Sequence, residues 1–69
     1  MQRQSVQSSN IHSVGYDENL QILEIVFKSS GIYEYYGVPK NVYRGLIEAP
    51  SKGKFLNEHI KGKYGYEKQ

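Results

Sequence analysis

The clearest pattern in the sequence is an alternation of apolar and polar residues. Leu23, Ile25 and Phe27 are spaced two residues apart, so in an extended chain they share one face of a strand. Turn-forming residues separate this segment from a β-prone segment on either side. The three predicted strands span residues 11–16, 20–28 and 32–36. Because short connections favour antiparallel hairpins, we expect a three-stranded meander.

Apolar residues recur at helical spacing in two later segments. The first set is Val42, Tyr43, Leu46 and Ile47, and the second is Phe55, Leu56, His59 and Ile60. Pro39 suits the first turn of a helix, and Ala49 before Pro50 favours the end of that helix. Ser51 is a good N-cap for a second helix, and Gly62 suits its C-terminal stop.

These elements predict an α+β fold in the order β-β-β-α-α, with two short helices packed on one face of the three-stranded antiparallel sheet. Residues 1–9 are rich in Gln and Ser and nearly free of apolar side chains, so we expect a disordered tail there. Residues 10–69 would form a single domain, whose last part is an extended tail carrying Tyr64 and Tyr66.

Composition limits the class of protein. A length of 69 residues suits one domain, and the absence of cysteine excludes disulfides and thiolate metal sites. The longest apolar run, Ile25 to Phe27, is far too short to cross a membrane, and the first ten residues are polar rather than signal-like. We therefore expect a cytoplasmic protein.

Charge is unevenly distributed, although the formal total is only +2. Residues 1–39 contain two basic and four acidic residues, whereas residues 40–69 contain seven basic and three acidic residues. An anionic partner is therefore expected at the C-terminal half, although a solvated lysine surface explains the same distribution.

The start of the second predicted helix has the chemistry of an anion site. It consists of Ser51, Lys52, Gly53 and Lys54. Free amide N–H groups, the positive end of the helix dipole, a hydroxyl and two lysines together suit a phosphate group. The motif is weak, and a tolerated charge misfit on the surface is the competing interpretation.

Further candidate binding residues lie along the same helix and after it. They are Asn57, Lys61, Lys63, Tyr64 and Tyr66. The lysines would extend a positive track and the two tyrosines would stack on bases, although lysines near a helix C-terminus also stabilise the helix itself. Tyr33 and Tyr35 are stacking candidates too, but the thin core of so small a domain favours a packing role for both.

Catalysis finds little support in the sequence. His12 and His59 are far apart, and neither has a second ligand at metal spacing. The run Asp17, Glu18 and Asn19 suits a turn better than an acid–base pair. We expect no catalytic residues, no metal and no cofactor.

The order and spacing of several short motifs resemble the KTSC domain family. The matching residues are Val14-Gly15-Tyr16-Asp17, Tyr33-Glu34-Tyr35, Val38-Pro39, Val42-Tyr43, Ser51-Lys52-Gly53, Phe55, Asn57, Ile60 and Tyr64-Gly65-Tyr66. The family is named for a C-terminal extension of some lysyl-tRNA synthetases and also occurs as small bacterial proteins. The resemblance implies RNA as a partner, through an association with the synthetase rather than through a mechanism.

Two hypotheses for function follow. The first is a non-catalytic module that binds RNA or another polyanion through the basic C-terminal half. The second is a protein-interaction module or a homo-oligomer that uses an exposed strand edge and the tyrosine surface.

Overall fold

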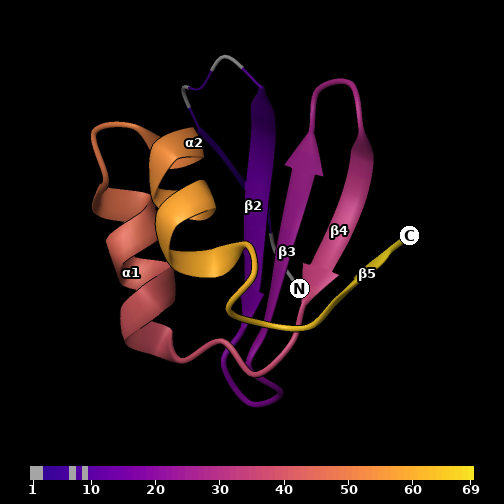
Figure 1. The fold of residues 1–69 in the computed structure, drawn as a ribbon, viewed down its shortest axis with the longest axis vertical. Coiled ribbons are helices and arrows are strands. Elements are labelled where there is room, and N and C mark those ends of the chain that lie inside the picture. Colours follow the sequence, from indigo (N-terminus) through magenta and orange to yellow (C-terminus); the bar gives the residue numbers. More distant parts are fainter. Residues whose placement is uncertain (1–2, 7, 9) are drawn as a thin grey trace.

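The computed structural model describes residues 3–6, 8 and 10–69. Within them it contains an antiparallel sheet with helices on one face (Figure 1). In chain order the elements are β1 (Arg3–Ser5), β2 (Ile11–Asp17), β3 (Ile22–Phe27), β4 (Gly31–Tyr35), α1 (Lys40–Glu48), α2 (Lys52–Phe55), the π-helical turn η1 (Leu56–Ile60) and β5 (Tyr66–Lys68). The strands follow the order β1-β2-β3-β4-β5 across the sheet, and each neighbouring pair is antiparallel.

The predicted three-stranded meander is wrong, because the sheet has five strands and continues after the helices. The three predicted strands lie at β2, β3 and β4, and the two additional strands form the edges. β1 comes from the segment expected to be a disordered tail, yet it pairs with β2 at Arg3 opposite Gly15. β5 comes from the expected extended tail and pairs with β4 at Tyr66 opposite Tyr35. Residues 1, 2, 7 and 9 of the predicted tail lie outside the described part of the chain.

Strand register gathers the large apolar side chains on the face that carries the helices. Ile25 lies between Val14 of β2 and Tyr33 of β4, and Leu23 lies opposite Tyr35. Residues directly opposite one another on antiparallel strands point to the same face, so these side chains form one continuous layer. Tyr33 and Tyr35 therefore lie on the inner face of the sheet, as their alternation predicts.

A β-bulge interrupts the alternation at the start of β2. The register moves from Ile11 opposite Phe27 to Ser13 opposite Val26, so β2 contains one extra residue at this point. As a result Ile11 and Val14 are both fully buried although they are three residues apart.

The two helical segments begin and end close to the predicted positions. Pro39 and Ala49 flank α1 in extended conformations, and Ser51 caps α2 by accepting a hydrogen bond from the backbone N–H of Lys54 at 3.3 Å. The second helix then changes to π-helical form, because the N–H of Lys61 donates to the carbonyl of Leu56 at 2.8 Å, five residues earlier. No helix in the described ranges combines the length and apolar character needed to span a membrane.

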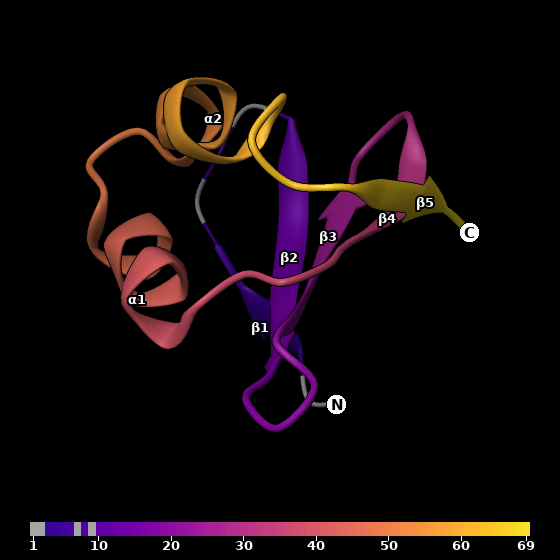
Figure 2. The ribbon, with the colours of Figure 1, turned by 60° about the horizontal axis from the view of Figure 1, so that its bottom comes forward.

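A single cluster of buried side chains joins the sheet to the helices. Its members are Ile11, Val14, Leu23, Ile25, Phe27, Tyr35, Val38, Leu46, Leu56 and Ile60. Figures 1 and 2 both place α1 and α2 beside β2, with β4 and β5 on the side of the sheet away from α1. The helical layer therefore covers only part of the inner face.

Candidate functional site

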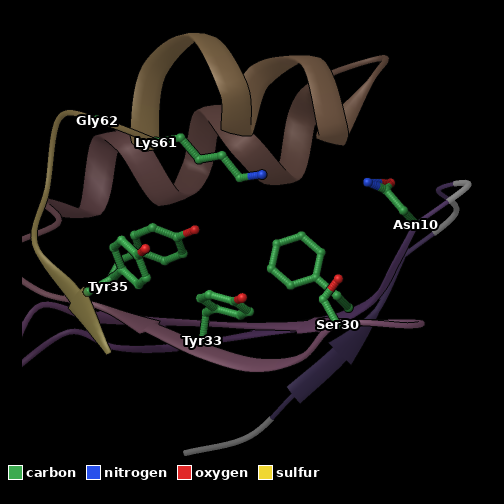
Figure 3. A pocket seen from close by; sticks show the side chains of 8 residues that line it. Asn10, Ser30, Tyr33, Tyr35, Lys61 and Gly62 are labelled. Carbon is green, nitrogen blue, oxygen red and sulfur yellow. The ribbon is translucent and has the colours of Figure 1, made fainter. Parts of the chain in front are cut away.

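A groove lies between the end of the second helix and the β3–β5 part of the inner face (Figure 3). Its sheet side is formed by Phe27, Tyr33, Tyr35 and Tyr66. Its remaining lining residues are Asn10, Ser30, Lys61 and Gly62. We refer to these eight residues as the aromatic groove. Its volume is about 400 Å³, which lies within the range of about 300–1,000 Å³ typical of small-molecule sites.

Alternation along the strands explains why aromatic rings gather here. Tyr33 and Tyr35 are two residues apart on β4, and Tyr66 of β5 pairs directly with Tyr35. All three rings therefore project from the same face of the sheet. Because α1 packs on this face near β2, away from β4 and β5, part of the face stays open, and Tyr66 is 58% exposed.

The rings contact one another in a connected row. The ring centroid of Tyr66 lies 5.5 Å from those of both Tyr33 and Tyr35, with interplanar angles of 38° and 37°. Tyr33 in turn packs against Phe27 at 5.3 Å with nearly perpendicular ring planes. These distances lie within the range of favourable aromatic pairs, so the rings hold each other in place. Tyr35 is only 2% exposed, so its side chain is part of the buried core and also lines the groove.

Two lysine ammonium groups lie over this row of rings. The Nζ of Lys61 is 5.5 Å from the ring centroid of Phe27, and the Nζ of Lys68 is 5.9 Å from that of Tyr33. Figure 3 shows Lys61 extending from the helix end along the groove, in the direction of Asn10. At these distances each lysine gains a cation–π attraction of about 0.5–1 kcal/mol, which holds its charge at the groove.

Acidic side chains lie on the opposite face of the sheet. Glu34 and Glu67 are paired across β4 and β5, and the hydroxyl of Tyr36 lies 3.3 Å from a carboxylate oxygen of each. Burial, followed by these two carboxylates, raises the pKa of Tyr36. None of the residues described as lining the aromatic groove is acidic, so its charge comes from lysine.

The hydroxyl of Tyr35 stays protonated over the physiological pH range. Burial is the main cause that raises the pKa of Tyr35 above its ordinary value of 10.0, with further contributions from Tyr66 and Tyr33. The groove thus has an uncharged hydroxyl that can donate a hydrogen bond to a ligand.

The predicted anion site at Ser51, Lys52, Gly53 and Lys54 has a different environment from the one that the sequence suggests. The hydroxyl of Ser51 accepts from the N–H of Lys54, and the Nζ of Lys52 donates to the carbonyl of Ala49 at 2.8 Å. Two of the expected phosphate-binding groups therefore have partners within the chain. Lys54 is exposed and, together with Glu58, lines a separate depression on the surface.

The structure brings together only two of the other predicted binding residues. Lys61 and Tyr66 both line the aromatic groove, whereas Asn57 and Lys63 are exposed outside it. Tyr64 is half-buried and packs against the core, which disfavours a stacking role.

Four groove residues and one flanking lysine were not among the predicted binding residues. The groove residues are Asn10, Phe27, Ser30 and Gly62, and the lysine is Lys68. The signal that was available is the pair Tyr33 and Tyr35, whose alternation places both on the inner face. Within the described ranges, no group of three His, Cys, Asp or Glu side chains is arranged to hold a metal ion.

Comparison with known proteins agrees with the resemblance read from the sequence. The family model for the KTSC domain matches residues 7–64. A crystal structure of a KTSC domain protein from Yersinia pestis superposes with a TM-score of 0.97 and 46% sequence identity, covering 99% of this chain and 96% of that one.

Curated relatives fall into two groups. A protein of Stutzerimonas stutzeri, named only as uncharacterised, is 44% identical over 61 residues, which are 88% of this chain and 86% of the relative. A lysine–tRNA ligase of Nostoc punctiforme is 43% identical over 61 residues, but that segment is only 11% of the ligase. The match over residues 7–64, together with these relatives, shows that the chain belongs to the KTSC domain family.

Proposed function

We propose that this protein is a non-catalytic module that binds single-stranded RNA in the aromatic groove. The observation that carries the proposal is the row of aromatic rings, in which the centroid of Tyr66 lies 5.5 Å from those of Tyr33 and Tyr35. The ammonium groups of Lys61 and Lys68 lie over the same row. Aromatic side chains stack on bases while lysines contact the phosphates, and this combination is typical of single-strand binding.

Two further observations support RNA as the ligand. The groove lining carries lysine and no carboxylate among the described residues, which is complementary to a phosphate backbone. The ligases with a similar segment act on tRNA according to their name, which is an association with RNA rather than a mechanism. Lys54 and Lys63 are exposed and add to the positive surface that an RNA strand would follow.

The test is a titration of fluorescently labelled single-stranded RNA at several salt concentrations. Lys61→Gln removes a charge at the groove, whereas Lys40→Gln removes one where Lys40 pairs with Glu18 at 2.8 Å. Both variants lower the formal charge of +2 by one, so they match in net charge. If Lys61 contacts a phosphate, its removal flattens the slope of log affinity against log salt by about 0.7, and Lys40→Gln leaves the slope nearly unchanged.

Stacking is tested separately with Tyr66→Leu, which keeps an apolar side chain on β5 but removes the ring. Loss of one stacked base costs about 1–3 kcal/mol of binding free energy. Equal affinities in the wild type, Lys61→Gln and Tyr66→Leu would contradict binding in the groove. Lys54→Gln tests the helix start independently, because Lys54 lies outside the groove.

The protein-interaction hypothesis remains a prediction with weaker support. Both sheet edges, β1 and β5, are only three residues long, and β5 carries Glu67 and Lys68. Short, charged edge strands discourage pairing with another chain. Light scattering at two salt concentrations separates the hypotheses: a mass that rises with protein concentration at high salt favours self-association, whereas a constant monomer mass favours the RNA-binding proposal.

A further inference from the structure

The edge strand β5 carries part of the aromatic groove and is weakly attached to the sheet (Figures 1 and 2). All three of its residues are exposed, and it pairs with β4 at the end of the strand order. Two backbone hydrogen bonds flank the paired residues: the N–H of Tyr36 donates to the carbonyl of Gly65 at 2.9 Å, and the N–H of Gln69 donates to that of Ile32 at 2.8 Å. A short, exposed edge strand opens locally more easily than the central strands.

The inner face of β5 favours its attachment to β4. The ring of Tyr66 contacts the rings of Tyr33 and Tyr35, and the ammonium group of Lys68 lies over the ring of Tyr33. Aromatic pairs and cation–π contacts are both attractive at these distances. Because Tyr66 and Lys68 lie on β5, detachment of this strand would remove one ring and one lysine from the binding surface.

The outer face of β5 opposes the same attachment. Glu67 lies directly opposite Glu34 of β4, and like charges in this arrangement destabilise a pair of strands. The hydroxyl of Tyr36 lies 3.3 Å from a carboxylate oxygen of each, but its single hydrogen is donated to only one of them at a time. Neither carboxylate forms an ion pair with a residue that the structure describes. The repulsion between the two strands is therefore only partly relieved.

We propose that β5 detaches from β4 and rejoins it in the free protein, and that RNA bound in the aromatic groove holds it in the attached position. The first part is a property of the free protein, whereas the second part rests on the proposed RNA-binding function. RNA contacts both Tyr66 and Lys68 only when β5 is attached, so it binds this state more tightly. A ligand that prefers one of two states shifts the population towards that state.

Amide hydrogen exchange measured by NMR tests the detachment of β5 in the free protein. The reporters are the N–H groups of Tyr36 and Gln69, whose hydrogen bonds join β4 to the segment that carries β5. Glu67→Gln removes the repulsion, and Glu58→Gln, at an exposed position on the second helix, is the control with the same net charge. We expect Glu67→Gln to slow exchange of both reporters by about 1.4- to 5-fold, the effect of one cross-strand pair, and Glu58→Gln to leave both rates unchanged.

Two outcomes would overturn the detachment of β5. One is an equal rate of exchange for both reporters in the wild type and in Glu67→Gln. The other is an equal slowing of the N–H of Lys28, which donates to the carbonyl of Asn10 at 2.9 Å next to β2 and β3, because that would indicate a change in the whole domain. Glu34→Gln removes the other partner of the repulsion and should slow the same two reporters.

The coupling to RNA is tested by adding single-stranded oligouridylate to the wild type, well above its measured dissociation constant. If RNA holds β5 in place, exchange of the Tyr36 and Gln69 amides slows by up to the ratio of the RNA concentration to that constant. Unchanged exchange with RNA bound would contradict the coupling while RNA binding stands. If no single-stranded RNA binds, the proposed function and the coupling are both wrong, and the comparison of the free variants still decides whether β5 detaches.

Discussion

Replacing Leu56 with alanine tests whether the second helix holds the domain together. Leu56 is 1% exposed and belongs to the buried cluster that joins the helices to the sheet. Removing a buried leucine side chain to alanine costs about 2–5 kcal/mol, through lost burial and the remaining cavity. A domain of 69 residues has a total stability of about 3.5–10 kcal/mol. The substitution therefore removes a large fraction of the stability.

The assay is urea unfolding followed by circular dichroism, with Leu20→Ala as the control. Leu20 is 67% exposed in the turn after β2, so the same change should cost no more than about 0.5 kcal/mol there. The slope of the unfolding free energy against urea concentration should stay the same in both variants, because unfolding exposes a similar area of surface in each. In heating experiments Leu56→Ala should melt at least ~8 °C lower. Similar losses in the two variants would refute the packing described for the second helix.

Three other predictions concern individual side chains. Tyr16→Phe removes the hydrogen bond from the Tyr16 hydroxyl to the carbonyl of Val38 at 2.6 Å, and should lower the free energy of unfolding by about 0.5–1.5 kcal/mol in urea titrations. The free energy of unfolding should fall as pH rises above 10.0, because the pKa of Tyr35 is raised in the folded state and the unfolded state loses the hydroxyl proton first. Urea unfolding across that pH range should show a smaller fall for Tyr35→Phe. Arg3→Gln should lower the melting temperature slightly at low salt and not at roughly 1 M salt, because it removes an exposed ion pair with Glu24.

Hydrophobic periodicity located the central strands and both helices because those elements bury one face. Leu23, Ile25 and Phe27 alternate, and all three are buried in the core. The edge strands carry no such signal, since β1 reads Arg-Gln-Ser and β5 reads Tyr-Glu-Lys. Both are exposed, and their backbone hydrogen bonds to neighbouring strands hold them in place. Periodicity cannot detect a strand that contributes no side chain to the buried core.

The candidate site was only partly predictable for a related reason. Alternation places Tyr33 and Tyr35 on the inner face, but the part of that face left open depends on where the helices pack. The sequence also does not show which lysines face the groove. The ammonium group of Lys52 donates to the carbonyl of Ala49, whereas that of Lys61 lies over Phe27. Both are lysines at ends of the same helix, so their difference arises from the tertiary structure.

The π-helical turn has a consequence for how the chain length can vary. The backbone hydrogen bond from Lys61 to Leu56 spans five residues, whereas an α-helical hydrogen bond spans four. Deleting one solvent-facing residue within it, such as Glu58, would therefore convert the turn to ordinary α-helix while leaving both end points in place. We therefore expect a one-residue deletion at this position, upstream of Lys61, to leave the lysine that lies over Phe27 in place.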